Sequence, residues 1–417
     1  MSEMKRRGRI AVIGGGASGI AAAVTAARLG AQVVVLERLD RIGKKILATG
    51  NGRCNLGNQN AFAEHYYTRN RKQLESLMKP MKPEGILRFF KEMGLLCDIQ
   101  EDGKVYPYCY QASMVLDVLR NALVQLGVEI ECSFEVNQII PRKGGYEIYA
   151  KDGRSITADQ VILAAGGQAS PKLGSNGSGL SLAKALGHHV NPVYPCLVPL
   201  KGKNPYLSGL KGIRAQCRVS LYRGDRMLQQ DTGEILFTEY GVSGIPAMQL
   251  SCRMGMEGKA QDLWLGLDFF PHMEWEQVTN MLFSRRKEFS DQTLEQYLLG
   301  TVNKKIAYGV LKSAGAAPLS RMVSSLSDRE VKNIAGQLKN WKVELTGTLS
   351  WDQAQVMGGG VRLDEVLPGT MESTLCPGLY LTGELLDAAG ECGGFNLHWA
   401  WWTGILAGKA AAQFGKT

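Results

Sequence analysis

The hydrophobic positions near the start of the chain fall into two kinds of run. Residues 10–13 and 33–36 are short, apolar and rich in β-branched side chains, which predicts buried strands. Residues 21–29 between them are rich in alanine, which favours a helix, and Gly30 follows as the helix end. The order strand, helix, strand predicts the first part of a parallel α/β domain.

The turn between this first strand and helix carries the spacing Gly14-x-Gly16-x-x-Gly19. Gly14 permits a tight turn, Gly16 lets the backbone approach a pyrophosphate, and Gly19 lets the helix pack closely on the strand. The helix N-terminus offers free N–H groups to phosphates. Glu37 ends the second strand, where its carboxylate can accept hydrogen bonds from ribose hydroxyls. These features predict dinucleotide binding, with NAD or FAD favoured over NADP.

Two more strand ends carry glycines. Residues 161–165 and 379–382 are predicted buried strands, followed by Gly166-Gly167 and by Gly383. Gly393-Gly394 then opens an apolar helix that runs to about residue 412. Because such glycines let a ligand approach the backbone, these segments predict one long dinucleotide. They come from both ends and the middle of the chain, so the cofactor domain is expected to be interrupted and then completed.

The region between residues 195 and 342 has another pattern. The segments QCRVSLYRG, RMLQQDTGEILFT and DLWLGLDFF are typical of antiparallel strands, and later segments have helical spacing, the last with Ser327 or Asp328 as its cap. The predicted fold is α/β, with a Rossmann-like cofactor domain interrupted by a small, barrel-like β unit and a helical unit. The predicted boundaries are 1–194 for the first part of the cofactor domain, 195–271 for the β unit, 272–342 for the helical unit and 343–417 for the completing part.

Charge and cysteine usage narrow the class of protein. The net charge of +9 favours anionic partners, but the basic residues are dispersed, so no nucleic-acid surface is expected. The nine cysteines include no C-x-x-C pair, which fits reduced thiols in the cytoplasm. No His, Cys and Asp cluster has metal-ligand spacing, and no run of about 18 apolar residues predicts a membrane span.

Four segments carry a family resemblance: GGGASG with Glu37, KILATGNGRCNLGN, GEILFTEYGVSGIPAMQLS, and MGGGVRLDEV…TMES…GLYLTGELLDAAGECGGFNLHWAW. With these segments the chain resembles the two-dinucleotide-binding-domain flavoproteins. More narrowly, it resembles the bacterial FAD-dependent family that includes aminoacetone oxidases and bile-acid dehydro-steroid reductases. The resemblance spans nearly the whole chain and implies that the cofactor domain binds FAD.

The resemblance also implies a set of cofactor-binding residues. The phosphate, ribose and adenine contacts would come from Gly14, Gly16, Ser18, Gly19, Glu37, Arg38, Val136 and Gly166. Contacts along the pyrophosphate and the flavin would come from Lys45, Gly52, Arg53, Cys54, Asn55, Gly383, Glu384, Asp387, Gly394, Phe395, Asn396 and Leu397. The last four would place a helix N-terminus at the flavin pyrimidine ring, where it stabilises the negative charge of reduced flavin.

The segment from residue 44 to 58 raises a choice for Cys54. No other cysteine lies nearby in the sequence, so a disulfide role is not expected. A flavin adduct and a simple contact beside the flavin both stay open. Gly50, Gly52 and Gly57 favour the second, because they let the backbone run close along the cofactor.

Two reactions fit the expected flavin. In the first, NADH or NADPH docks transiently, since only one full dinucleotide fingerprint is present, and an enone-type or steroid-like anionic substrate is reduced. In the second, an amine of the aminoacetone type is oxidised with oxygen. The positive charge favours the reductase. No catalytic residue is assigned; Tyr108, Tyr240 and His398 are candidates for the acid.

A reading of another class is a tRNA-associated flavoprotein, since related flavoproteins bind tRNA. Against it, no basic run is interleaved with aromatic residues. We therefore expect a small-molecule substrate as the partner, no nucleic acid and no membrane, and we predict no particular oligomeric state.

Overall fold

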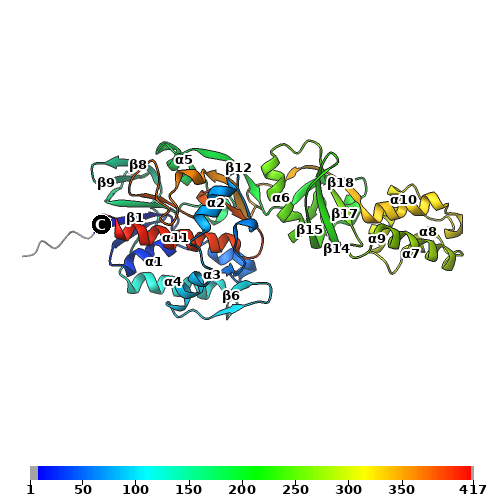
Figure 1. Ribbon diagram of the computed structural model, residues 1–417, viewed down its shortest axis with the longest axis horizontal. Helices are drawn as coiled ribbons and strands as arrows, with labels where there is room; N and C mark the ends of the chain where they lie inside the picture. Colours follow the sequence, from blue (N-terminus) through cyan, green and yellow to red (C-terminus); the bar gives the residue numbers. More distant parts are fainter. Residues whose placement is uncertain (1–7, 415–417) are drawn as a thin grey trace, which may run out of the picture. The chain divides into compact units, whose positions relative to one another are not determined.

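The computed structural model describes residues 8–414, which form two compact units (Figure 1). The first unit combines the chain up to Tyr194 with the chain from Gln355 onward. The second unit is the continuous segment Pro195–Ala354. The first unit is therefore interrupted by an insertion, as the three separate glycine-bearing strands predicted.

A five-stranded sheet with parallel pairing forms the centre of the first unit, in the order β20-β11-β1-β2-β7. Its strands are β1 (Arg9–Ile13), β2 (Gln32–Leu36), β7 (Glu129–Glu131), β11 (Gln160–Leu163) and β20 (Leu379–Leu381). Four of the five read as nearly continuous apolar runs because both faces of the sheet are covered. The pairing of β11 with both β1 and β20 joins the beginning, the middle and the end of the sequence.

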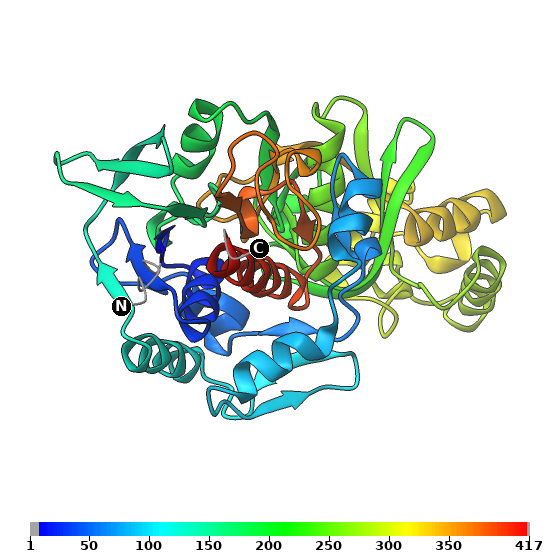
Figure 2. The ribbon, with the colours of Figure 1, turned by 60° about the vertical axis from the view of Figure 1, so that its left-hand side comes forward.

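Two helices from opposite ends of the chain lie side by side along this sheet (Figure 2). They are α1 (Ala17–Arg28) and α11 (Phe395–Gln413). A Cβ atom at Gly404 would lie 2.2 Å from the carbonyl oxygen of Ser18, and one at Gly408 would lie 2.3 Å from that of Ala22. The glycines of α11 thus allow a backbone approach that no other residue would permit. The contact brings the last segment of the chain onto the first.

Smaller elements surround the central sheet. The antiparallel sheet β8 (Val136–Arg142), β9 (Gly145–Ala150) and β10 (Ser155–Ala158) precedes β11, and β3 (Gly57–Asn58), β6 (Lys104–Pro107) and β5 (Cys97–Ile99) form another sheet. Two strand pairs are β4 (Tyr66–Tyr67) with β21 (Ala389–Gly390) and β12 (Val190–Cys196) with β19 (Val356–Val361). The other α-helices described in this unit are α2 (Arg71–Met78), α3 (Pro83–Lys91), α4 (Ala112–Gln125) and α5 (Ser178–Ala185).

The second unit contains a closed six-stranded barrel in the order β13-β16-β15-β14-β17-β18. Its strands are β13 (Leu200–Lys203), β14 (Arg214–Arg223), β15 (Arg226–Phe237), β16 (Gly241–Ser243), β17 (Leu263–Asp268) and β18 (Trp341–Thr348). The helices of this unit are α6 (Ile245–Glu257), α7 (Trp275–Glu288), α8 (Leu294–Tyr297), α9 (Lys304–Ser313) and α10 (Asp328–Lys339). One hydrophobic cluster joins barrel residues such as Leu265 to helix residues such as Leu282 and Ile334.

The predicted boundary at residue 343 differs from the structure. Strand β18 pairs with β17 and β13, so residues 341–348 close the barrel instead of completing the first unit. The physical reason is its alternation, since Trp341, Val343 and Leu345 are buried and the residues between them are exposed. The predicted helical unit, residues 272–342, also shares its core with the barrel instead of standing alone.

In the part of the chain from residue 8 to 414, we find no helix of the length and apolar character needed to cross a membrane.

Candidate active site

The turn after β1 gives each fingerprint glycine a different environment. Gly14 has a φ of +107°, which favours glycine, and its N–H donates to the carbonyl of Leu36 at 2.9 Å. A Cβ at Gly19 would lie 1.9 Å from the carbonyl oxygen of Gly14, so α1 packs directly on the turn. No atom lies within 4 Å of where a Cβ of Gly16 would stand. The open side of Gly16 faces a cavity whose wall includes Gly14, Gly16 and Ser18.

The cavity receives the N-terminus of α1. Gly16 is the N-cap of this helix, and no side chain caps it. The N–H groups of the first turn have no acceptor within the helix, and the helix dipole gives this end a partial positive charge. Such an end binds phosphate groups.

Glu37 lies at the end of β2, on the wall of the same cavity. One carboxylate oxygen accepts the N–H of Gly15 and the other accepts the N–H of Leu39, both at 2.8 Å. These bonds fix the carboxylate before any ligand arrives, and each oxygen keeps a free lone pair. The site therefore suits the two hydroxyls of a ribose and opposes a phosphate on either of them.

Arg38 is committed to the protein itself. Its Nε and Nη2 atoms donate to the carbonyl of Gly174 at 3.2 and 3.0 Å. Residues 173–175 line the cavity, as does Val136. Arg38 thus fastens the loop that closes this part of the wall, which is a different role from a free cation beside an adenine.

Lys45 and Glu384 form a half-buried ion pair on the cavity wall, with 2.8 Å between Nζ and Oε2. Lys45 Nζ also donates to the carbonyl of Ala169 at 3.2 Å. The other oxygen of Glu384 accepts the N–H of Met357 at 2.7 Å. The contacts of this pair join the segment after β2, the loop after β11, β19 and the segment after β20, so four distant parts of the chain meet at the ion pair.

The start of α11 forms another part of the wall through Asn396 and Leu397. Gly394, with a φ of +96°, is the N-cap, and no side chain caps the helix. The side chain of Asn396 binds back to Gly390, accepting its N–H at 2.8 Å and donating to its carbonyl at 2.7 Å. The cavity therefore has an uncapped helix N-terminus from each of two helices.

The structure brings eleven of the predicted cofactor residues to this cavity wall. They are Gly14, Gly16, Ser18, Glu37, Arg38, Lys45, Val136, Gly166, Glu384, Asn396 and Leu397. The others are not on the wall: Gly19, Gly52, Arg53, Cys54, Asn55, Gly383, Asp387, Gly394 and Phe395. Several of these support the wall, because Gly19 packs α1 on its turn and Gly394 caps α11.

Asp387 is held away from the wall by other partners. Its Oδ2 accepts the side-chain N–H of Asn191 at 2.7 Å and the backbone N–H of Arg69 at 3.1 Å. Burial raises the pKa of this carboxyl. Asp387 therefore ties β12 to the segment before α2.

Cys54 is fully buried and has a φ of +58°. Burial raises the pKa of its thiol to about 11, so the thiol stays protonated near neutral pH. Gly50, Asn51 and Gly52 beside it also have positive φ, and Gly52 and Arg53 are exposed. The loop has an irregular backbone, and its cysteine is a packed thiol.

The three acid candidates lie apart from one another. Tyr108 is 65% exposed, and Tyr240 belongs to the second unit. His398 lies on α11, is only 2% exposed and does not line the cavity. Burial lowers the pKa of His398 to about 3, so its ring is neutral and cannot donate a proton as an imidazolium. None of the three is on the cavity wall.

Several wall residues are absent from the predicted cofactor-binding set, among them Arg41, Thr49, Gln355, Val356, Trp399 and Ala400. For four of them a signal was present. Trp399 and Ala400 lie three and four positions after Asn396, so they share its helix face. Gln355 and Val356 directly precede the MGGG segment, which the family resemblance had singled out.

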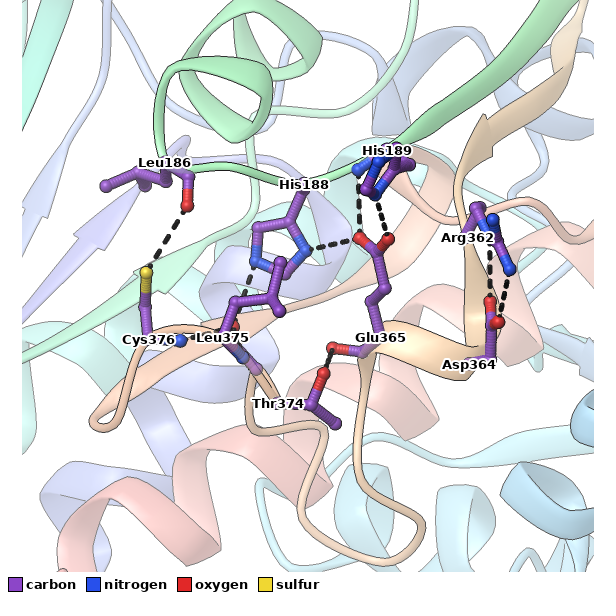
Figure 3. Close-up of polar contacts among 10 residues, drawn as sticks. Leu186, His188, His189, Arg362, Asp364, Glu365, Thr374, Leu375 and Cys376 are labelled. Carbon is purple, nitrogen blue, oxygen red and sulfur yellow. Dashed lines mark hydrogen bonds and ion pairs between the residues drawn. The ribbon is translucent and has the colours of Figure 1, made fainter.

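Figure 3 shows a second polar cluster in the first unit, around His188 and Glu365. These two residues do not line the cavity. His188 Nδ1 lies 2.9 Å from Glu365 Oε2, and His188 Nε2 lies 2.9 Å from Ser373 Oγ. The order resembles a hydrolase triad, but Ser373 is buried and its Oγ already accepts the N–H groups of Leu375 and Cys376. The cluster therefore fastens two segments together. Among residues 8–414, no three His, Cys, Asp or Glu side chains are grouped to hold a metal ion.

The cavity fits FAD in its donor set. Uncapped helix N-termini suit phosphates and an electron-rich ring, the held carboxylate of Glu37 suits a ribose, and the open side of Gly16 admits a group against the backbone. These features define the class: a Rossmann-type dinucleotide-binding flavoenzyme.

Residues 8–410 match the family described as HI0933-like protein Rossmann domain, and the chain belongs to this family. The predictions of the fold class and of an FAD-dependent oxidoreductase are thereby confirmed.

Relatives with curated functions cover nearly the whole chain. The chain is 41% identical over 410 residues to the 3-dehydro-bile acid delta(4,6)-reductase of Clostridium scindens, covering 97% of this chain and 99% of that protein. It is 27% identical over 401 residues to the ribosomal RNA dihydrouridine synthase of Haemophilus influenzae, covering 94% and 95%. A flavocytochrome c3 fumarate reductase structure shares the fold at 15% identity, with a TM-score of 0.51 over 97% of this chain and 78% of that one.

Proposed function

We propose that the chain is an FAD-dependent reductase that takes electrons from NADH or NADPH and reduces a carbon–carbon double bond conjugated to a carbonyl in a steroid-like, anionic substrate. The observation that carries the proposal is the cavity wall, with two uncapped helix N-termini and the held carboxylate of Glu37. The similarity to a bile-acid reductase over nearly the full chain supports the substrate class.

FAD would supply the hydride-transfer chemistry, which no amino-acid side chain provides. The chain's own residues would bind and orient it. In this proposal the first turn of α1 holds the pyrophosphate, Glu37 holds the ribose, and the first turn of α11 lies at the pyrimidine end of the flavin. The partial positive charge of α11 then favours the reduced, electron-rich ring.

The electron donor is proposed from the number of dinucleotide fingerprints. The sequence contains one full Gly14-x-Gly16-x-x-Gly19 pattern, and its Glu37 opposes a phosphorylated ribose. A nicotinamide dinucleotide would therefore dock transiently beside the flavin without a dedicated domain. The scattered thiols fit a reducing cytoplasm as the place of action.

The test is anaerobic flavin reduction followed by reoxidation. The purified protein is reduced with NADH or NADPH, and then mixed with a 3-oxo-Δ4 bile acid, with the saturated analogue as the control. Reoxidation by the enone alone supports the proposal. Reduction of the flavin by aminoacetone, with reoxidation by oxygen only, supports the amine-oxidase alternative and overturns the reductase.

A second candidate function follows from the relatives named ribosomal RNA dihydrouridine synthases. Uracil also contains a carbon–carbon double bond conjugated to a carbonyl, so the same type of reduction applies. In this second candidate function the nucleic-acid substrate is ribosomal RNA, in place of the tRNA considered from the sequence. Incubation with unmodified ribosomal RNA and NADH or NADPH, followed by mass spectrometry of the nucleosides, tests it. Formation of dihydrouridine at a rate above that of enone reduction would favour the RNA substrate.

A further inference from the structure

We propose that His398 is a positioning residue for the cofactor: it holds the loop Cys54–Asn58 against the first turn of α11 and so sets where that turn faces the cavity. The inference rests on the proposed FAD site. It concerns the same helix end that contributes Asn396 and Leu397 to the cavity wall.

The contact joins a backbone N–H to an imidazole ring. The N–H of Asn58 donates to His398 Nδ1 at 3.3 Å, and the surroundings are buried. Asn58 lies in β3, which pairs with β6, yet this N–H takes its acceptor from the helix. A buried N–H without an acceptor is costly. The ring of His398 removes this cost by accepting the N–H of Asn58.

The loop and the helix also meet at close range on either side of His398. Trp401 Nε1 donates to the carbonyl of Leu56 at 3.0 Å, and the Asn55 amide, oriented so that both of its ends are satisfied, accepts the N–H of Gly394 at 3.2 Å. A Cβ at Gly57 would lie 2.9 Å from His398 Nδ1. The two segments therefore fix each other's position.

The protonation state of His398 follows from this arrangement. Burial lowers the pKa of His398 to about 3, so the ring is neutral at working pH and carries its proton on Nε2 while Nδ1 accepts. Nε2 is buried and has no partner among residues 8–414. An apolar side chain would avoid that unpaired N–H, but it would leave the N–H of Asn58 without an acceptor.

The contact of His398 with the loop affects the cavity through the first turn of α11, because Asn396 and Leu397 of this turn line the cavity wall. The N–H of Gly394 donates to the Asn55 amide, whereas the N–H groups that follow it in α11 are free of intrahelical bonds. The helix dipole acts only within the first turn, so a small displacement of this turn changes the charge stabilisation it offers. A loosened loop would therefore disfavour the reduced flavin more than the oxidised flavin.

Three variants test the role. His398→Leu removes the acceptor, and His398→Gln restores one through its amide oxygen. His188→Leu is the matched control, because His188 is an equally buried histidine of the same unit that does not line the cavity. Should His398→Leu not fold, His398→Met removes the acceptor with a longer, flexible side chain.

Three readouts are measured on each variant. In His398→Leu, the Asn58 amide of the FAD-free protein should exchange with solvent about tenfold faster, and FAD should bind about tenfold more weakly. The preference for reduced over oxidised flavin should fall about tenfold, a shift of about −30 mV in the two-electron midpoint potential. His398→Gln should stay within about threefold of the wild type in both binding and exchange.

Two results would overturn the inference. One is a His398→Leu potential and FAD affinity no different from those of His188→Leu; the other is a His398→Gln variant as impaired as His398→Leu. If the wild-type protein binds no FAD, the proposed function falls and this inference falls with it. If the wild type binds FAD and His398→Leu is normal, only the positioning role is wrong.

Discussion

At the scale of the residue, burial decides whether a side chain such as the thiol of Cys54 is reactive, and the residue type alone does not. Cys54 is a thiol in a glycine-rich loop, which from the sequence allowed an adduct with the flavin. Its side chain is fully buried, and burial raises its pKa to about 11. A sequence pattern cannot report that burial, because it depends on segments that are distant along the chain.

The first prediction concerns the reactivity of Cys54. The thiolate is the reactive form, and at pH 8 a pKa of about 11 leaves about one part in a thousand of it. Iodoacetamide should therefore label the exposed Cys109 rapidly and leave Cys54 unmodified in the folded protein. Mass spectrometry of peptides after brief labelling checks this, and equal labelling of the two would contradict it. Cys54→Ser should keep its FAD.

The second prediction concerns Glu37. Its carboxylate is held by two backbone N–H groups and faces the cavity, so Glu37→Ala should weaken FAD binding by about tenfold to a hundredfold. Glu135 is the matched control on the same wall, since it forms an ion pair with Lys151. Glu135→Gln should change the affinity by less than about threefold. Titration of FAD into the FAD-free proteins, followed by flavin fluorescence, measures both, and equal losses would refute the special role of Glu37.

At the scale of the element, local patterns predicted the strands and helices well. The capping box is an example: Ser327 accepts the N–H of Glu330, and the side chain of Glu330 accepts the N–H of Ser327. Strand β18 was not expected, because its alternation acquires a meaning only when β13 and β17 lie on either side of it. The polar cluster of His188, Glu365 and Ser373 could not be predicted, since it joins segments about 180 positions apart.

The third prediction concerns how much this polar cluster contributes to the stability of the folded protein. His188→Leu removes a buried partner of both Glu365 and Ser373 and should lower the free energy of unfolding by about 2 kcal/mol. His189 is the control: its side chain is 73% exposed and its Nδ1 bonds the other oxygen of Glu365 at 2.7 Å. His189→Gln should cost at most about 1 kcal/mol. Urea denaturation measures both values, and equal losses would contradict the account.

The contribution of His188 in this polar cluster to folding stability should depend on pH, with a definite sign. Burial lowers the pKa of His188 below 6.5 in the folded protein, so folding favours the neutral ring. The unfolded chain binds a proton near pH 6.5 and the folded chain does not, so stability falls as the pH drops below about 6.5. The stability lost between pH 7 and pH 5 should be smaller in His188→Leu than in the wild type. An equal or larger loss in the variant would contradict this sign.

At the scale of the whole molecule, the chain leaves the Rossmann-type unit after Tyr194 and returns to it at Gln355. The insertion and the approximate start of the second unit followed from the sequence, because glycine-bearing strands recur on both sides of it. Its end did not, because the alternation of β18 identifies a barrel strand only once β13 and β17 lie on either side of it. Within the second unit, the barrel and its helices share one hydrophobic cluster.

The fourth prediction follows from that division. Residues 195–354 form a closed barrel with its own hydrophobic cluster, so this segment expressed alone should fold. It should unfold cooperatively in thermal circular dichroism and bind no FAD. A fragment without a cooperative transition would mean that the second unit depends on the first for its stability.

The most direct measurement of the central claim is the anaerobic reoxidation of the reduced protein. We expect that the purified protein carries FAD, that NADH or NADPH reduces it, and that a 3-oxo-Δ4 bile acid restores the oxidised flavin spectrum without oxygen. A protein that takes up no FAD would contradict the account. So would a bound flavin that the enone leaves reduced while an amine reduces it and oxygen restores it.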